Sequence, residues 1–347
     1  MPVTVTKGEG NAWPTDQQDT TDVLPIPVTA TKLLVVSTKG VQAPLIVSDA
    51  GLAAQFAWDE FIYAKIRNPH TRRSYLHVVE QFLDHCRALG RELQQVAPRD
   101  VGLYLDDLPH SPATKKLHLS ALRHFFDTLV SRHVVVLNPA ASVRGERLQV
   151  IEGKTPEIGV RQARALLNDI AVTNVVGLRD RAIIGILIYT AARVGAVAKL
   201  RRGDFYSDAD QFCLRFTEKG GKSREIPVRH DLRQYIADYL NASHLDYAEK
   251  SSSLFRTTVR RTKQLTQSGM TADDITRMTK RRLKDAKLSD RLSPHSFRVT
   301  TITDLLSQGV SLEDVQNLAG HADPRTTRLY DRRQRQVTRN IVERISV

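Results

Sequence analysis

The stretch SPHSFRVTTITDLLSQGVSLEDVQNLAGHADPRTTRLYDR, residues Ser293 to Arg332, decides how the rest of the chain is interpreted. It begins with a histidine and an arginine, His295 and Arg298, that lie three residues apart. Residues at this spacing share one face of a helix, so both side chains can point at one ligand.

Further along the same stretch, Gly320-His321 precedes Tyr330 by nine residues. Gly320 should end a helix, because glycine adopts the left-handed conformation at low cost. His321 would then lie at a turn and face outward, and Asp323-Pro324 would restart a helix that carries Tyr330. Each of these residues alone is ordinary: a solvated loop histidine, a surface arginine, a half-buried tyrosine. Their order and spacing together favour a functional site.

Composition limits the classes of protein that fit. The 347 residues suffice for two domains with sizeable cores. Lys and Arg number 51 against 38 Asp and Glu, giving a net charge of +13 and a pI near 9.9. This excess predicts a polyanionic partner, with nucleic acid first and an anionic membrane surface second.

Cysteine usage and hydropathy indicate a cytoplasmic protein. Cys86 and Cys213 are far apart and form neither a disulfide framework nor a metal-ligand cluster. The longest apolar run, Ala182 to Ala192, has 11 residues and is flanked by arginines, so it is too short to span a bilayer. We find no secretory signal pattern, and we expect no membrane partner and a nucleoid-associated location.

The first half of the chain predicts a tail followed by a helical domain. Residues 1–48 are rich in Thr, Pro, Val and Gln without a helical period, and we expect a flexible tail. Residues 49–148 predict four or five helices, including one from a Ser48 cap, one capped by Thr71 and one opened by Ser111-Pro112. Residues 149–158 predict a linker.

Basic residues cluster where the second and fourth of these helices begin: Arg72, Arg73, Lys115 and Lys116. Such charges are often only a solvated face. Here the helix N-termini already favour phosphate, so a DNA-facing surface is an equal alternative.

Residues 159–347 predict a second domain of mixed structure. Helical patterns cover Gln162 to Ile170, Leu178 to Leu200 and Arg233 to Leu240. Alternating residues on both sides of Gly220-Gly221 predict a hairpin over Gln211 to Val228. Residues 250–270 predict a loop, and Thr271 to Leu288 a basic helix with a capping box.

Two further residues are candidates for the site. Arg193 follows the apolar run, where an arginine is costly unless it is paired or meets an anion; a salt bridge to Asp204 is the simpler interpretation. Lys219 lies at the tip of the hairpin, where a lysine is ordinarily solvated but can also reach into a groove.

These residue types fit the cleavage of a phosphodiester without a metal ion. Two arginines can offset the charge that develops on the non-bridging oxygens. A tyrosine in cationic surroundings can attack once a nearby base accepts its proton, and a lysine can protonate the departing oxygen. The sequence lacks HExxH, zinc-ligand spacing and a P-loop, so we expect neither a metal nor ATP as cofactor.

The chain resembles the tyrosine recombinases, the phage integrase family of the Cre and Xer type. The resemblance spans roughly residues 50–347 and is strong from Asp180 onward. Thr190-Ala191-Ala192-Arg193-Val194-Gly195 is similar to the family's first arginine motif, TGLRxSEL, and EKGGKSREIP to its hairpin lysine motif. His295 and Arg298 match the HxxR pair, and Gly320-His321 with Thr326-Thr327 and Tyr330 match the GH and TTxxY motifs.

The resemblance implies roles for individual residues. Arg193 and Arg298 would clamp the scissile phosphate, and His321 would donate to a non-bridging oxygen. His295 would accept a proton, Lys219 (or Lys222) would protonate the 5′-oxygen, and Tyr330 would take the 3′-phosphate. The family's acidic residue three positions after the first arginine is replaced by Ala196, which implies a weakened enzyme or a substitute carboxylate.

The family fold implies a mainly α protein with a small antiparallel β-sheet. A helical SAM-like core-binding domain and an α+β catalytic domain would form a clamp around double-stranded DNA. The basic helix would enter the major groove with Arg277, Lys280, Arg281 and Lys284. An apolar tail after Tyr330 would dock on a neighbouring subunit, giving a homo-tetramer by cyclic exchange.

We therefore expect a site-specific DNA recombinase. A type IB topoisomerase that relaxes DNA with the same chemistry is one alternative. A non-catalytic DNA-binding protein on a decayed recombinase fold is another, supported by Ala196 alone.

Overall fold

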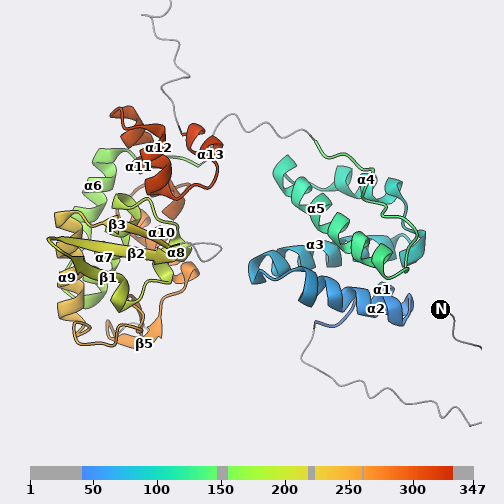
Figure 1. Ribbon diagram of the computed structural model, residues 1–347, viewed down its shortest axis with the longest axis horizontal. Coiled ribbons are helices and arrows are strands. Elements are labelled where there is room, and N and C mark those ends of the chain that lie inside the picture. Colours follow the sequence, from blue (N-terminus) through green and yellow to red (C-terminus); the bar gives the residue numbers. More distant parts are fainter. Residues whose placement is uncertain (1–40, 147–154, 218–222, 260–261, 331–347) are drawn as a thin grey trace, which may run out of the picture. The chain divides into compact units, whose positions relative to one another are not determined.

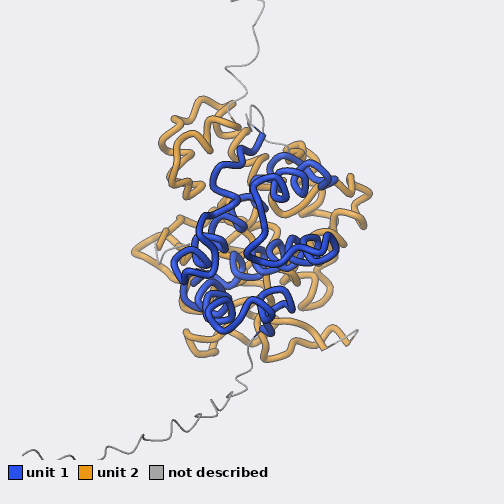
Figure 2. The backbone as a smooth tube through the Cα atoms, turned by 90° about the vertical axis from the view of Figure 1, so that its right-hand side faces the viewer, with its two compact units in different colours: residues 1–148 blue, residues 149–347 orange. Residues whose placement is uncertain are grey.

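A computed structural model of the chain describes residues 41–146, 155–217, 223–259 and 262–330. They belong to two compact units, residues 1–148 and residues 149–347 (Figure 2). Both units consist mostly of helices, and the second adds small antiparallel sheets (Figure 1). The predicted fold class is thereby confirmed.

The first unit packs its helices around an aromatic core. Trp58, Phe61 and Phe125 are fully buried and meet in tilted or edge-on contacts, with ring centroids 5.4 to 6.5 Å apart. The long helices α3 and α5 lie side by side. The elements of this unit are α1 (Leu45–Asp49), α2 (Leu52–Asp59), the π-helix η1 (Glu60–Lys65), α3 (Pro69–Ala88), η2 (Leu93–Gln95), α4 (Pro98–Asp107) and α5 (Pro112–Ser131).

Two boundaries in this unit differ from the sequence-based expectation. Residues 45–48, predicted to lie in the tail, belong to α1, whose Ile46 and Val47 are buried in the core. Helix α3 begins at Pro69 rather than after Thr71, because the Asn68 side chain accepts from the backbone N–H groups of His70 and Thr71.

The second unit is built around α7 (Val175–Tyr189). This helix is buried along most of its length and packs against α6, α9, α10 and α11, as an apolar core helix should. The other helices are α6 (Val160–Asp169), α8 (Val194–Ala198), η3 (Arg202–Asp204), α9 (His230–Ala242), α10 (Ala272–Asp285), α11 (Pro294–Ser307), α12 (Leu312–Ala319) and α13 (Pro324–Arg328). No helix among the described residues is both long and apolar enough to cross a membrane.

The predicted hairpin is confirmed and gains a third strand. Strands β2 (Gln211–Thr217) and β3 (Ser223–Pro227) pair antiparallel with Leu214 opposite Ile226, and β1 (Phe205–Asp208) pairs with the other edge of β2. The loop predicted over residues 250–270 is wrong. It contains the antiparallel pair β4 (Arg256–Thr258) and β5 (Leu265–Gly269), whose polar residues give no alternating apolar signal.

The single helix predicted from Leu178 to Leu200 is also wrong, because the chain breaks between α7 and α8. Thr190 Oγ1 donates to the Ile186 carbonyl at 2.7 Å at the end of α7. Ala191 then adopts a left-handed backbone conformation with φ of 49°, which a helix cannot continue through. The break gives Arg193 its position at the start of α8.

Candidate active site

Helix α11 brings His295 and Arg298 to one face of the second unit. The helix starts at Pro294, and His295 lies exposed in its first turn. Arg298, one turn later, is only 1% exposed, and its guanidinium donates to the carbonyl of Ala191. A buried cation requires such a partner, so this contact fixes α11 against the break that follows α7.

Arg193 reaches the site from the other side of that break. Its two terminal nitrogens lie 3.4 and 3.5 Å from the Gly320 carbonyl oxygen, which accepts long hydrogen bonds from them. Arg193 is exposed, in contrast to Arg298. The two arginines thus contact carbonyls 127 and 107 residues away in sequence, respectively.

The Gly320-His321 pair ends α12 as predicted, but His321 does not face outward. Gly320 is left-handed with φ of 63°, and the His321 N–H donates to the Gln316 carbonyl at 3.1 Å. The His321 side chain is 7% exposed, and its Nδ1 lies 2.8 Å from Thr327 Oγ1. The turn therefore directs the imidazole inward, against α13.

Tyr330 lies just beyond α13, which is capped by the Asp323 side chain. Its ring packs on a small apolar cluster formed by Ala191, Ile302, Leu306, Val315 and Ala319. The ring also stacks on His321, with centroids 5.9 Å apart and an interplanar angle of 8°. Its hydroxyl is 3.4 Å from Nε2 of His295. The phenol and both imidazoles are thus neighbours.

Burial and the two nearby arginines keep both histidines uncharged. Burial, followed by the positive charges of Arg298 and Arg193, lowers the pKa of His321 to about 3. Partial desolvation and the same two charges lower the pKa of His295, although part of that imidazole is open to solvent. Both rings are therefore neutral near neutral pH, and each can either donate or accept a proton.

Of the basic residues in the hairpin, only Arg224 can be placed near the site, since the predicted lysines are not described. Lys219 and its alternative Lys222 lie outside the described residues, between Thr217 of β2 and Ser223 of β3, which pair with each other. Arg224 on β3, which was not among the residues predicted from the sequence, also lowers the pKa of His321 through its charge. Its only sequence signal was a basic residue within the alternating pattern after the hairpin turn.

The basic helix α10 holds the candidates Arg277, Lys280, Arg281 and Lys284, three of which have partners within the protein. Arg277 pairs with Asp274 at 2.5 Å, and Lys280 Nζ donates to the Asp290 carbonyl at 2.5 Å. Arg281 remains 56% exposed at its side chain but binds the fully buried Asp180 at 2.9 Å. Asp180 also accepts from Arg179 and Arg282.

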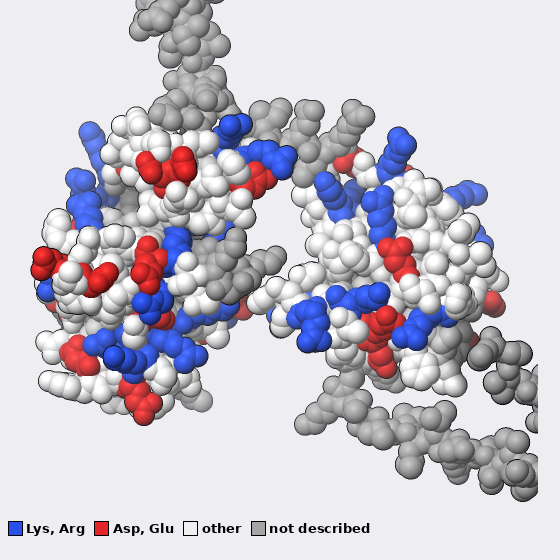
Figure 3. Space-filling model, viewed as in Figure 1, with Lys and Arg blue, Asp and Glu red and all other residues white. Residues whose placement is uncertain are grey.

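Of the four basic candidates in the first unit, two donate to carbonyls within the protein and two are exposed to solvent. Arg72 is half-buried and donates through Nε and a terminal nitrogen to the Ile66 carbonyl, at 3.2 and 2.9 Å. Lys115 Nζ lies 3.3 Å from the Asp106 carbonyl oxygen. Arg73 and Lys116 are exposed. Over each unit, the face shown in Figure 3 carries lysine and arginine with acidic side chains among them.

Comparison with known families gives two matches along the chain. Residues 159–336 match the phage integrase family, and residues 57–133 match the N-terminal SAM-like domain of phage integrases. The first match alone covers the described catalytic candidates from Arg193 to Tyr330.

Individual relatives and solved structures agree with these matches. The tyrosine recombinase XerC of Chlamydia trachomatis serovar L2 is 29% identical over 221 residues, which is 64% of this chain and 67% of the relative. XerC of Anoxybacillus flavithermus is 28% identical over 274 residues, covering 75% and 86%. Among solved structures, a XerH recombinase bound to a palindromic difH substrate has a TM-score of 0.61, 18% identity and 78% coverage of each chain. A lambda integrase tetramer on a Holliday junction has a TM-score of 0.61 and 15% identity, covering 85% of this chain and 83% of the other.

Proposed function

The chain belongs to the phage integrase family, and we propose that it is a site-specific DNA recombinase that cleaves and rejoins duplex DNA through a phosphotyrosine at Tyr330. One observation carries the proposal: the Tyr330 hydroxyl lies 3.4 Å from a neutral imidazole, His295, beside two arginines. A phenol needs both an acceptor for its proton and positive charge around it to attack phosphorus.

The proposed reaction is a transesterification. The Tyr330 oxygen bonds to phosphorus as the bond to the 5′-oxygen breaks, and the phenolic proton passes to His295. Arg193 and Arg298 bind the non-bridging oxygens, with His321 as a further donor. Lys219 supplies a proton to the 5′-oxygen. Attack by the 5′-hydroxyl of a partner strand reverses these steps, releases Tyr330 and joins the strands.

Double-stranded DNA is the proposed substrate for both units, which would place the protein at the nucleoid in the cytoplasm. Among the predicted DNA contacts, the strongest candidates are those whose side chains are open to solvent, namely Arg73, Lys116, Lys284 and the exposed part of Arg281. Exposed cations of this kind contribute binding that depends on salt and little on sequence.

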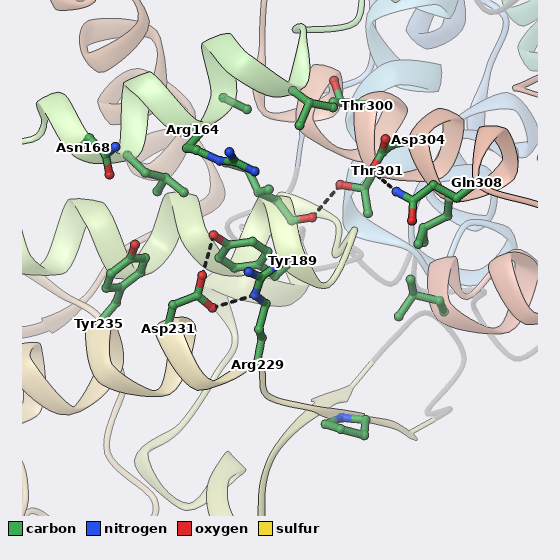
Figure 4. Close-up of a pocket in the computed structure, with 17 residues that line it drawn as sticks. Arg164, Asn168, Tyr189, Arg229, Asp231, Tyr235, Thr300, Thr301, Asp304 and Gln308 are labelled. Atoms are coloured by element: carbon green, nitrogen blue, oxygen red, sulfur yellow. Dashed lines mark hydrogen bonds and ion pairs between the residues drawn. The ribbon is translucent and has the colours of Figure 1, made fainter. Parts of the chain in front are cut away.

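A homo-tetramer on DNA, held by exchange of the C-terminal tail, is the proposed assembly. The tail candidates Val337, Ile341, Val342 and Ile345 lie outside the described residues. A pocket of about 700 Å³ in the second unit offers a site for the tail of a neighbouring subunit (Figure 4). Its wall includes apolar side chains of α6, α7, α11 and α12, among them Leu167, Ile188 and Leu305.

The pocket is lined by residues of α7 and α11, the helix that precedes Arg193 and the helix that carries Arg298. Thr301 on its wall donates to the Ile188 carbonyl at 2.5 Å (Figure 4). Thr301 lies one turn after Arg298, and Ile188 lies five residues before Arg193. A tail bound here would therefore contact α7 and α11, next to Arg193 and Arg298. Assembly would in this way be coupled to activity.

Tail exchange is tested with a truncation and a filled pocket. Removal of residues 336–347 should abolish strand exchange while leaving binding to a single site intact. Gln308→Trp at the pocket rim should have the same effect, whereas Gln234→Trp on the exposed face of α9 serves as the matched control. Full strand exchange by the truncated protein would rule out this assembly.

The catalytic proposal is tested by trapping the covalent complex on nicked DNA. A nicked library of genomic fragments should give protein–DNA adducts that resist detergent, and sequencing the attached DNA identifies the site. Tyr330→Phe should bind DNA and form no adduct, while Tyr247→Phe, a tyrosine that is 98% exposed, should react as the wild type does. An adduct with Tyr330→Phe contradicts the proposal, and relaxation of supercoils by monomers without site preference favours the topoisomerase.

A further inference from the structure

Thr327 is a buried polar residue beside His321 that takes no part in the proposed reaction. It lies in α13, three residues before Tyr330, and is fully buried. Its hydroxyl oxygen is 2.8 Å from Nδ1 of His321. Across the described parts of the chain, this is the one hydrogen bond of the Thr327 hydroxyl.

This single contact constrains where the proton of His321 lies. A neutral imidazole carries one proton, on Nδ1 or on Nε2, and the low pKa of His321 keeps the ring neutral near neutral pH. If the proton were on Nδ1, it would be donated to Thr327, and the buried hydroxyl proton would have no acceptor. An unpaired buried donor costs about 1–3 kcal/mol. If Nδ1 is the acceptor, both groups are satisfied.

We propose that Thr327 is a positioning residue that holds His321 in the tautomer with its proton on Nε2. The hydroxyl donates to Nδ1, so Nε2 becomes a hydrogen-bond donor and cannot act as a base. This deepens the proposed function, on which it rests, because it assigns His321 to donation toward a phosphate oxygen. The proposal also gives the two histidines different chemical roles, since His321 donates a hydrogen bond and His295 accepts a proton.

His295 has the opposite requirement. Its Nε2 is the atom that faces the Tyr330 hydroxyl at 3.4 Å, and it can accept the phenolic proton only if its own proton is on Nδ1. The two imidazoles would thus hold opposite tautomers within one site. Because Thr327 and Tyr330 are joined by the same short turn, with the Tyr330 N–H donating to the Thr327 carbonyl at 3.0 Å, one segment orients both the donor and the nucleophile.

Nitrogen NMR of the full chain tests the tautomer without DNA and without activity. The protein is labelled with ¹⁵N-histidine, and the His321 signals are assigned by their loss in His321→Gln. In the wild type and in Thr327→Ser, we expect a protonated Nε2 and an unprotonated Nδ1. In Thr327→Val, which keeps the shape and removes the hydroxyl, we expect a mixture of tautomers or a proton on Nδ1.

Cleavage of nicked DNA supplies the second measurement. Thr327→Val should lower the cleavage rate on the order of 100-fold with DNA binding unchanged, and Thr327→Ser should restore it to within a few fold. A proton on Nδ1 of wild-type His321 overturns the proposal, even if the valine variant does not fold. So does a valine variant that keeps both the Nε2 proton and the wild-type rate. An adduct formed by Tyr330→Phe would instead refute the proposed function and leave the tautomer result standing.

Discussion

Lowering the pH from about 8 to about 5 should destabilise the second unit by about 2 kcal/mol through His321 alone. The pKa of this imidazole is about 3 in the folded protein against 6.5 for the free group. Between these values the unfolded chain binds a proton that the folded protein excludes. The stability due to the neutral ring is therefore complete above about pH 6.5 and is lost as the pH falls from there toward 3.

The magnitude follows from the unfolded state. At pH 5 nearly all unfolded chains carry a proton on this histidine, and folded molecules carry almost none. The resulting free energy is RT ln(1 + 10^1.5), or about 2 kcal/mol. A folded pKa anywhere below about 4 gives the same value at this pH, so the prediction depends chiefly on His321 being buried among cations.

Urea unfolding of the wild type and of His321→Asn at both pH values isolates this contribution. Both tryptophans, Trp13 and Trp58, precede residue 149. Tryptophan fluorescence therefore follows the first unit and circular dichroism follows both, so the second transition can be separated. His230→Asn, at an exposed position of α9, is the control.

The free energy of unfolding of the second unit should fall by about 2 kcal/mol more in the wild type and the control than in His321→Asn. The fluorescence transition should not distinguish the variants. Equal losses in wild type and His321→Asn would show that the imidazole is protonated as easily in the folded protein as in water, and the electrostatic account of the site would be wrong.

Other substitutions probe separate contacts. Asp180→Asn leaves Arg179, Arg281 and Arg282 without their shared carboxylate and should lower the free energy of urea unfolding by about 3–5 kcal/mol; a loss below 1 kcal/mol would mean that this cluster does not hold α10 to α7. Lys116→Ala, at an exposed position, should reduce the slope of log binding constant against log salt by about 1 in DNA titrations, and an unchanged slope would remove it from the DNA surface. Ala191→Val should destabilise the second unit by at least about 1 kcal/mol in thermal unfolding, because a β-branched residue is strained at a φ of 49°; wild-type stability would contradict this.

Local structure was largely predictable from the sequence. The apolar run within α7, the stop at Gly320 and the alternation around the hairpin each depend on residues within a few positions of one another. The sequence also predicted the order of the site residues and the family resemblance. These residues are Arg193, His295, Arg298, His321 and Tyr330.

Other features depended on contacts that local patterns do not encode. The turn after α7 interrupts an apolar run whose pattern predicts a single helix. The Ala191 carbonyl freed by this turn accepts from Arg298, 107 residues away. His321 follows a glycine that predicts exposure, yet the packing of α13 buries it and gives it Thr327 as a partner.

The sequence by itself determined which side chains are present and how each short segment bends, because helix periods, caps and turns are set by neighbouring residues. Only the tertiary structure decided where those side chains meet and which are neutral. Proton affinity depends on burial and on charges from α8 and α11 that come near His321 only when the chain is folded.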